Sequence, residues 1–188
     1  MADTPLASIP REQLPEEFQP AWDALNGLTG EPTFVEVFAQ APEVLRFVMN
    51  DFSMKLFFGG AVDNHYKQLA RLKLSLVHGC RTCNKQNVPG ALEAGITQAQ
   101  VDAMDNYEHG PFTDAEKAVL EFADQIVLTN MAGDMTDERY ARLSAHFTDA
   151  EICELGTVMA VVAGMAKLSF ILHLVEREEY CPFGVNAA

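Results

Sequence analysis

The sequence predicts an all-α protein, and three observations support that prediction. Apolar residues recur at helical spacing along most of the 188 residues. No stretch alternates polar and apolar residues for long enough to form a half-buried strand. The pentapeptide Phe-Thr-Asp-Ala-Glu occurs at 112–116 and again at 147–151, and its threonine and glutamate form the pattern of a capping box. Both copies therefore predict helix starts.

The first helix with a clear signal is predicted to begin at Pro42 and to end at the glycine pair 59–60. Proline suits a first helical turn, and five apolar residues follow at helical spacing as one stripe: Val44, Phe47, Val48, Phe52 and Leu56. The next helix is predicted from about Asp63 to His78. Gly79 then introduces a pair of cysteines.

A long helix is predicted from Asp149, with an apolar run from Leu155 to Leu172 that Lys167 interrupts. Its small residues recur every four positions on one face, where another helix could approach closely: Gly156, Ala160 and Gly164. The run is near the lower limit for a membrane span, about 17 residues. The interior lysine and the acidic flanks disfavour that alternative. We expect a core helix that also offers a subunit contact.

Length and composition predict one domain over residues 1–188. Within it we expect an N-terminal arm at 1–30, a core at about 62–132 and a flexible tail at 181–188. With 48% hydrophobic residues, the chain can bury a core without disulfide bonds. The formal net charge of -14 disfavours nucleic acid and anionic membranes as partners. The N-terminus has neither a basic start nor an apolar run, so we expect a cytoplasmic location.

The four cysteines are too few for a disulfide framework, and only two of them form a motif. Cys80 and Cys83 are three residues apart at a predicted helix start, where they can close a disulfide or open to a dithiol. A helix N-terminus also stabilises a thiolate. Cys153 is expected to be a buried side chain that fills space in the core. Cys181 is expected to be a free thiol in the tail, without a role in the chemistry.

Residues 64–92 contain no aspartate or glutamate although the chain as a whole is acidic. We call this segment the basic window, after its five cations: Lys67, Arg71, Lys73, Arg81 and Lys85. A local positive field lowers the pKa of a thiol and attracts anionic substrates. Arg81 is the member that lies between the two cysteines and could assist them. The alternative is that the five side chains simply lie on solvent-exposed faces of helices.

Zinc is the main competing interpretation of the cysteine pair. A zinc site needs about four ligands, and beyond the cysteines the nearest candidates are His78 and His65. The sequence has no second Cys-x-x-Cys motif. A thioredoxin-like use of the motif belongs to a βαβ context, which is absent here. We therefore expect no bound metal or cofactor.

The stretch from about Gln68 to Met104 resembles the core of the carboxymuconolactone decarboxylase and alkylhydroperoxidase D-like superfamily. The residues that carry the resemblance are Cys80-Arg81-Thr82-Cys83, the segment Gly90-Ala91-Leu92-Glu93-Ala94-Gly95-Ile96-Thr97, and Val101. The resemblance implies an all-helical bundle that forms homo-oligomers. It also implies reduction of hydroperoxides with electrons from a lipoyl-type or thioredoxin-like dithiol donor. The decarboxylase branch lacks the cysteine pair, so this sequence is similar to the redox branch.

The sequence departs from that branch at two positions of a proton relay. Where the branch has a histidine after its second cysteine and a glutamate before its first, this sequence has Asn87 and Gln68. Amide side chains accept no proton at ordinary pH, and His78 or His65 could take over proton transfer. Pro89 is expected to kink or end the cysteine helix.

By resemblance Cys83 attacks and Cys80 resolves, whereas the helix dipole favours attack by Cys80, so the order stays open. The predicted function is that of a thiol-dependent oxidoreductase, which reduces a small hydroperoxide or disulfide by cycling Cys80 and Cys83 between dithiol and disulfide. The alternative is a relay-deficient family member that serves as a redox-sensing or binding subunit without efficient peroxidase activity.

Overall fold

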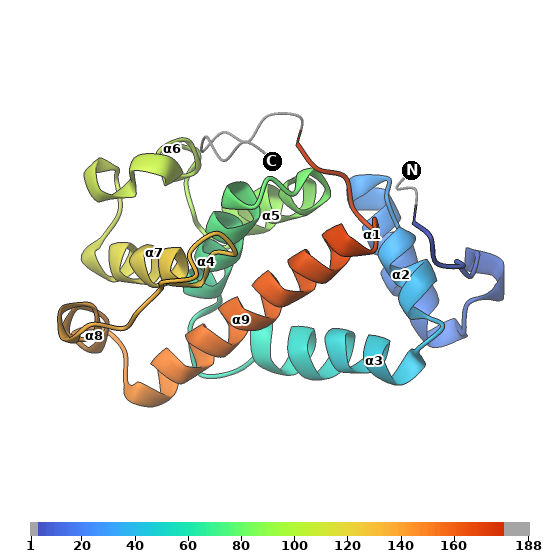
Figure 1. The fold of residues 1–188 in the computed structure, drawn as a ribbon, viewed down its shortest axis with the longest axis horizontal. Helices are drawn as coiled ribbons and strands as arrows, with labels where there is room; N and C mark the ends of the chain where they lie inside the picture. The colour runs from blue at the N-terminus through green and yellow to red at the C-terminus, as the bar shows by residue number, and fades with distance from the viewer. Residues whose placement is uncertain (1–3, 179–188) are drawn as a thin grey trace.

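The computed structural model describes residues 4–178 and confirms the all-α fold (Figure 1). In chain order the elements are η1 (Arg11–Gln13), η2 (Glu16–Phe18), α1 (Gln19–Thr29), α2 (Thr33–Phe38), α3 (Pro42–Arg46), η3 (Phe47–Phe57), α4 (Asn64–Val77), α5 (Arg81–Glu93), α6 (Gln98–Asp102), η4 (Met104–His109), α7 (Asp114–Ile126), α8 (Asp137–Ser144) and α9 (Asp149–Ile171). Within residues 4–178, β-type pairing is limited to one isolated bridge between Cys80 and Arg177.

Helix α4 lies at the centre of the molecule, because α5, α7 and α9 all pack against it. One hydrophobic cluster joins α4, α7 and α9 through residues that include Leu74, Val119 and Met159. A second joins α4, α5 and α7 through Leu72, Ala91 and Leu120. Figure 1 shows α9 running across the molecule from α8 toward α1 and α2. The cysteine segment between α4 and α5 is thus held on a buried helical hairpin.

The N-terminal segment 1–30 was expected to be an arm, but from residue 14 it packs into the domain. Leu14 and Phe18 are buried in a third hydrophobic cluster together with Val35, Leu45 and Leu174. That cluster takes residues from both ends of the described chain. The periodicity of a short segment gives no sign of such a long-range contact, so the sequence alone did not reveal it.

The helix predicted from Pro42 begins as expected, but it becomes a π-helix from residue 47. The amide of Phe58 donates to the carbonyl of Ser53, five residues earlier, at 2.8 Å. Within η3 this wider turn shifts the buried face away from the predicted stripe, whereas Val44 and Leu45 lie before it, in the α-helical α3. Val44 and Phe47 are exposed, whereas Leu45 and Phe57 are buried. The predicted stripe assumed a period of 3.6 residues per turn, which does not apply here.

Local capping signals predicted helix starts well. The boxes at Thr113 and Thr148 both form, each with its hydroxyl and glutamate carboxylate in reciprocal bonds. A third capping box, at Thr97 with Gln100, was not predicted. Asp63 caps α4 by accepting from the amide of His65, at the predicted start. Pro89, by contrast, does not end the cysteine helix, because α5 continues to Glu93.

Helix α9 has one buried and one exposed face. Leu155, Met159 and Ala163 enter the core, but Cys153 lies opposite them and is exposed, so its predicted burial was wrong. Gly156 accommodates the ring of Phe122, since a Cβ there would come within 3.0 Å of it. Ala160 and Gly164 are exposed. Among the described residues, α9 alone is long and apolar enough to cross a membrane, and 33% of its most apolar window is buried.

Candidate functional site

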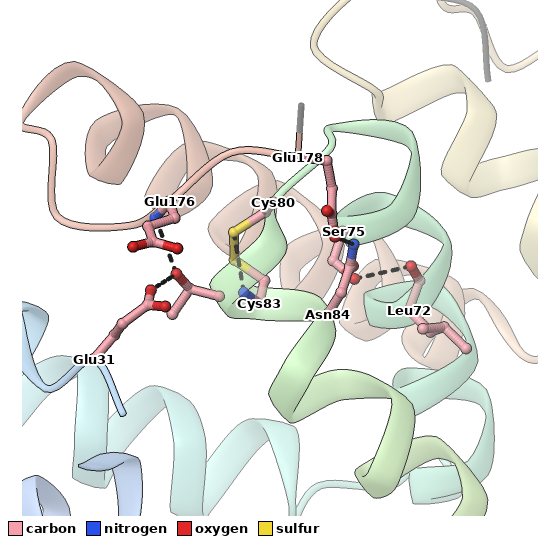
Figure 2. Close-up of a disulfide and its surroundings, with 9 residues drawn as sticks. Glu31, Leu72, Ser75, Cys80, Cys83, Asn84, Glu176 and Glu178 are labelled. Carbon is pink, nitrogen blue, oxygen red and sulfur yellow. Dashed lines mark hydrogen bonds between the residues drawn. A yellow bond between two sulfur atoms is a disulfide. The ribbon is translucent and has the colours of Figure 1, made fainter. Parts of the chain in front are cut away.

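The cysteine pair lies at the reversal between α4 and α5. Gly79 has a φ of 62°, a left-handed conformation that glycine adopts without strain, and it turns the chain after α4. Cys80 then occupies the N-cap of α5, and its Sγ accepts a hydrogen bond from the amide of Cys83 at 3.2 Å. The two residues are joined as a disulfide, with their Cα atoms 5.1 Å apart (Figure 2). The pair therefore lies at a helix start, as the sequence predicted.

A segment near the C-terminus, residues 174–178, covers the first cysteine and is called the strap below. The amide of Arg81 donates to the carbonyl of Glu176 at 3.0 Å, and the amide of Glu178 donates to the carbonyl of Gly79 at 2.9 Å. Figure 2 shows the strap passing beside Cys80, with Glu176 and Glu178 on either side. Cys80 is 0% exposed. The strap and the hairpin together bury this sulfur.

A buried carboxylate next to the pair was missed in the sequence. Glu31, at the turn between α1 and α2, accepts hydrogen bonds from the hydroxyl of Thr82 and from Nζ of Lys85, the latter at 2.6 Å. Burial opposes ionisation of Glu31, but these two donors outweigh it and lower its pKa. The amide of Glu176 donates to Thr82 at 3.0 Å, which ties the strap to this cluster. An acidic residue beside glycine and proline has the sequence of an exposed turn, so no local signal marked Glu31.

The two sulfurs differ in access. A cavity of about 320 Å³ lies among α1, α2, α3, η3, α4, α5 and α9, and Cys83 lines it while Cys80 does not. Most of the wall is apolar, with contributions from Phe34, Leu45, Met49, Phe52 and Met165. Its polar lining includes Arg71, Ser75, His78 and Asn87, from the α4–α5 hairpin. A small molecule in this cavity would meet Cys83.

His78 lines the cavity, but its hydrogen bonding disfavours a role as proton acceptor. Its Nε2 accepts from the amide of Leu128 at 3.1 Å, which assigns the ring proton of the neutral imidazole to Nδ1. Burial lowers the pKa of His78 to about 4, so the ring is neutral at ordinary pH. Its Nδ1 is buried and has no partner within residues 4–178. His78 therefore contributes a neutral ring to the cavity wall, with an unpartnered N–H at Nδ1.

His65 is engaged away from the cysteines. Its ring nitrogens lie 2.9 Å from the carbonyl of Ala94 and 2.8 Å from Oε1 of Glu116. Glu116 is the capping glutamate of α7, so His65 fastens the start of that helix to the end of α5. His65 is not part of the cavity wall. The contacts assign it a structural role.

The two relay positions are both buried, with different surroundings. Asn87 lines the cavity one helical turn after Cys83, and within the described residues no hydrogen bond joins the two. Gln68 lies outside the cavity wall, and its Oε1 has no partner within residues 4–178. A Cβ placed on Gly90 would come within 3.4 Å of that oxygen. Neither amide is placed to accept a proton from Cys83.

The basic window is largely neutralised by carboxylates from distant parts of the chain. The ion pairs are Lys67–Glu154 at 2.7 Å, Lys73–Asp124 at 3.2 Å, Arg81–Glu176 at 3.2 Å and Lys85–Glu31 at 2.6 Å. The fifth cation, Arg71, has no carboxylate partner within residues 4–178. The predicted broad positive field is therefore absent, and the cation left in the cavity wall is Arg71.

The zinc interpretation finds no support in the arrangement of possible ligands. Within residues 4–178, no three His, Cys, Asp or Glu side chains gather in a way that could hold a metal ion. His78 and His65 bond to Leu128 and to Glu116 and Ala94 instead. Cys181, the remaining cysteine, lies outside the described residues, as does the predicted tail at 181–188.

Comparisons with known proteins identify the fold. Residues 42–125 match the model of the Carboxymuconolactone decarboxylase family. An uncharacterized protein, YdfG of Bacillus subtilis (strain 168), is 21% identical over 139 residues, which are 73% of this chain and 92% of that protein. The match to the family model confirms the resemblance that was predicted from the cysteine segment.

Two solved structures have a similar fold. One is the alkylhydroperoxidase AhpD core of an uncharacterized peroxidase-related protein from Ralstonia eutropha JMP134, with a TM-score of 0.72, 13% identity and coverage of 94% of this chain and 93% of that one. The other is ATU0492 from Agrobacterium tumefaciens, a protein of unknown function, with a TM-score of 0.62, 23% identity and coverage of 72% and 92%. At these identities the likeness shows the fold, which is the predicted alkylhydroperoxidase D-like bundle.

Proposed function

Because residues 42–125 carry the core of the carboxymuconolactone decarboxylase family, we propose that this protein is a thiol-dependent oxidoreductase of its cysteine-bearing kind. It reduces a hydroperoxide by cycling Cys80 and Cys83 between dithiol and disulfide. The observation that carries the proposal is the asymmetry of the pair. Cys83 lines an apolar cavity, whereas Cys80 is buried beneath the strap with its sulfur bonded to that of Cys83.

In the first step the Cys83 thiolate attacks the terminal peroxide oxygen. The O–O bond breaks, the sulfur becomes a sulfenic acid, and the leaving alkoxide takes a proton from water to give an alcohol. The Cys80 thiolate then attacks the sulfenic sulfur and releases hydroxide, which is protonated to water. The two cysteines have lost two electrons, and the product is the disulfide that the structure contains.

In the second step an external dithiol regenerates the pair. A donor thiolate attacks the Sγ of Cys83, which is the sulfur that lines the cavity, and Cys80 leaves as a thiolate. The hydrogen bond from the amide of Cys83 stabilises negative charge on Cys80 and makes it the better leaving group. The second donor thiol then displaces Cys83 and forms the donor disulfide. A lipoyl-type or thioredoxin-like dithiol fits this role.

Slow proton transfer is the expected weakness of the site. Asn87 and Gln68 accept no proton, and His78 already uses Nε2 as an acceptor. A free thiol has a pKa of about 8.5, so only a few per cent is thiolate at pH 7. The peroxidase reaction therefore depends on hydroxide or buffer to ionise Cys83. The rate should rise with pH across the neutral range.

That Asn87, Gln68 and His78 cannot accept a proton from Cys83 also motivates a second candidate function. In a redox-sensing or binding subunit, the same pair would respond slowly to oxidants and report through the strap, which hydrogen bonds on both sides of Cys80. The proposed cytoplasmic location and homo-oligomeric state apply to either function.

Consumption of cumene hydroperoxide with dihydrolipoamide as donor tests the proposal. Wild-type protein should turn over many equivalents, and the Cys83→Ser variant should turn over none. Turnover by Cys83→Ser at the wild-type rate would overturn the proposal. If wild-type protein forms the disulfide once but does not turn over with this donor or with thioredoxin, the sensing function is the better account.

A further inference from the structure

Arg71 is a half-buried cation that lacks the counter-ion its neighbours have. The other four cations of the basic window each pair with a carboxylate. Arg71 lines the cavity beside apolar side chains, and its Nε is buried with no hydrogen-bond partner within residues 4–178. Burial lowers the pKa of Arg71 to about 10, and the group is still charged at neutral pH. A buried, unpaired charge is costly, and an anion in the cavity would offset that cost.

The guanidinium is held in place by its surroundings. Its central carbon lies 4.8 Å from the ring centroid of Phe57, in the geometry of a cation–π contact. On the α5 side it packs over Gly90, where a Cβ would come within 2.8 Å of Nη2. A planar donor fixed in this way is pre-organised for a planar, two-oxygen acceptor.

A second unpartnered donor belongs to another residue of the same wall. His78 follows Arg71 by two helical turns, so both project from one face of α4. Its Nδ1 carries the proton and has no partner within the described chain. Three other polar side chains of the wall, Ser75, Thr82 and Glu31, are engaged with protein partners. Ser75 donates to the carbonyl of Leu72, and Thr82 donates to Glu31.

We propose that the cavity receives an organic acid whose carboxylate binds Arg71 and whose hydrocarbon part lies against the apolar wall. Cys83 forms part of the same wall, so the natural substrate would be an apolar hydroperoxide that carries a carboxylate. This last statement rests on the function proposed above, whereas binding of the acid does not. Cavities of about 300 Å³ and more commonly hold small organic ligands.

The test compares octanoate with 1-octanol, which share an eight-carbon chain and differ in the anionic head group. Binding of each to the disulfide form is measured by isothermal titration calorimetry. Octanoate should bind wild-type protein about 10- to 100-fold more tightly than 1-octanol, the range expected for a charge-assisted hydrogen bond. The preference should disappear in Arg71→Met and should persist in the control Lys55→Met, which removes an exposed lysine outside the cavity.

A second variant keeps the test valid if Arg71→Met does not fold. Gly90→Ala keeps the charge of Arg71 but places a methyl group 2.8 Å from Nη2, which displaces the guanidinium, so it should reduce the octanoate preference and leave 1-octanol binding unchanged. The proposal is overturned if wild-type protein binds octanoate no more tightly than 1-octanol, or if the preference survives in Arg71→Met. Loss of peroxidase activity with the preference intact would instead count against the proposed function alone.

Discussion

The amide of Cys83 donates a hydrogen bond to the Sγ of Cys80 at 3.2 Å, so the backbone of one cysteine stabilises the sulfur of the other. The cavity lies on the side of Cys83, and the strap covers Cys80. The two cysteines therefore have different expected roles, although the sequence left their order open.

The first prediction concerns which cysteine is oxidised. In Cys80→Ser, a sulfenic acid should persist at residue 83 after one equivalent of peroxide, because no resolving thiol remains. Dimedone labelling and peptide mass spectrometry should locate the adduct on Cys83. Cys83→Ser is the matched control and should give little adduct, since Cys80 is 0% exposed. A faster and stronger adduct on Cys80 would reverse the assigned order.

The second prediction restores the missing relay. Asn87→His with Gln68→Glu supplies a proton acceptor one turn from Cys83 and a carboxylate to orient it. General base catalysis typically contributes about 10²- to 10⁴-fold, so turnover at pH 7 should rise and its pH profile should shift downward.

Gln68→Glu alone is the control for this pair of changes. A Cβ on Gly90 would meet both Nη2 of Arg71, at 2.8 Å, and Oε1 of Gln68, at 3.4 Å, so the new carboxylate would lie near that guanidinium and is expected to pair with it. The single variant should gain no peroxidase rate. If wild-type protein is already fast at pH 7 and the double variant is slower, the site has another means of activation.

The third prediction concerns acid stability. His78 has a pKa lowered from 6.5 to about 4 in the folded protein, so the unfolded chain binds a proton more readily. The stability that depends on neutral His78 is fully present above pH 6.5 and is lost as the pH falls toward 4, by up to about 3 kcal/mol. Urea unfolding between pH 7 and pH 4 measures it. His78→Gln should flatten this dependence and the exposed His146→Gln should not, and equal slopes for both would contradict the prediction.

The fourth prediction concerns the buried ion pair between α4 and α9. Nζ of Lys67 lies 2.7 Å from Glu154 and 2.8 Å from the carbonyl of Leu56, and the side chain is 0% exposed. Lys67→Met leaves Glu154 without its cation and should lower the free energy of unfolding by about 3 to 5 kcal/mol. Chemical denaturation measures the loss. Lys55→Met breaks the exposed pair with Asp51 and should have a much smaller effect, so similar losses would show that burial is not the cause.

The fifth prediction is that the chain forms a homo-oligomer. Ala160, Gly164, Leu168 and Ile171 form an exposed stripe on α9 that a second copy could cover. Light scattering should give a mass that is a multiple of 20.7 kDa. Ala160→Glu should shift the mass toward the monomer, whereas Ala141→Glu, at an exposed position of α8, should not. A monomer at all concentrations of the wild-type protein would contradict the prediction.

The sequence by itself determined the features that depend on neighbours along the chain. Helical periodicity gave the all-α class, and the capping boxes at Thr113 and Thr148 marked helix starts, because those bonds join residues three positions apart. The spacing of Cys80 and Cys83 likewise predicted that they can form a disulfide, and that the pair lies at the start of α5.

Only the tertiary structure decided which charges and sulfurs are free to act. Lys67 and Arg81 are neutralised by Glu154 and Glu176, residues far away in the sequence, whereas no described carboxylate reaches Arg71. Burial of Cys80 likewise depends on the strap, which joins the hairpin from the other end of the chain. Such long-range contacts depend on how the helices pack in space. The periodicity of the sequence shows which face of a helix is apolar, but it does not show which residues that face contacts.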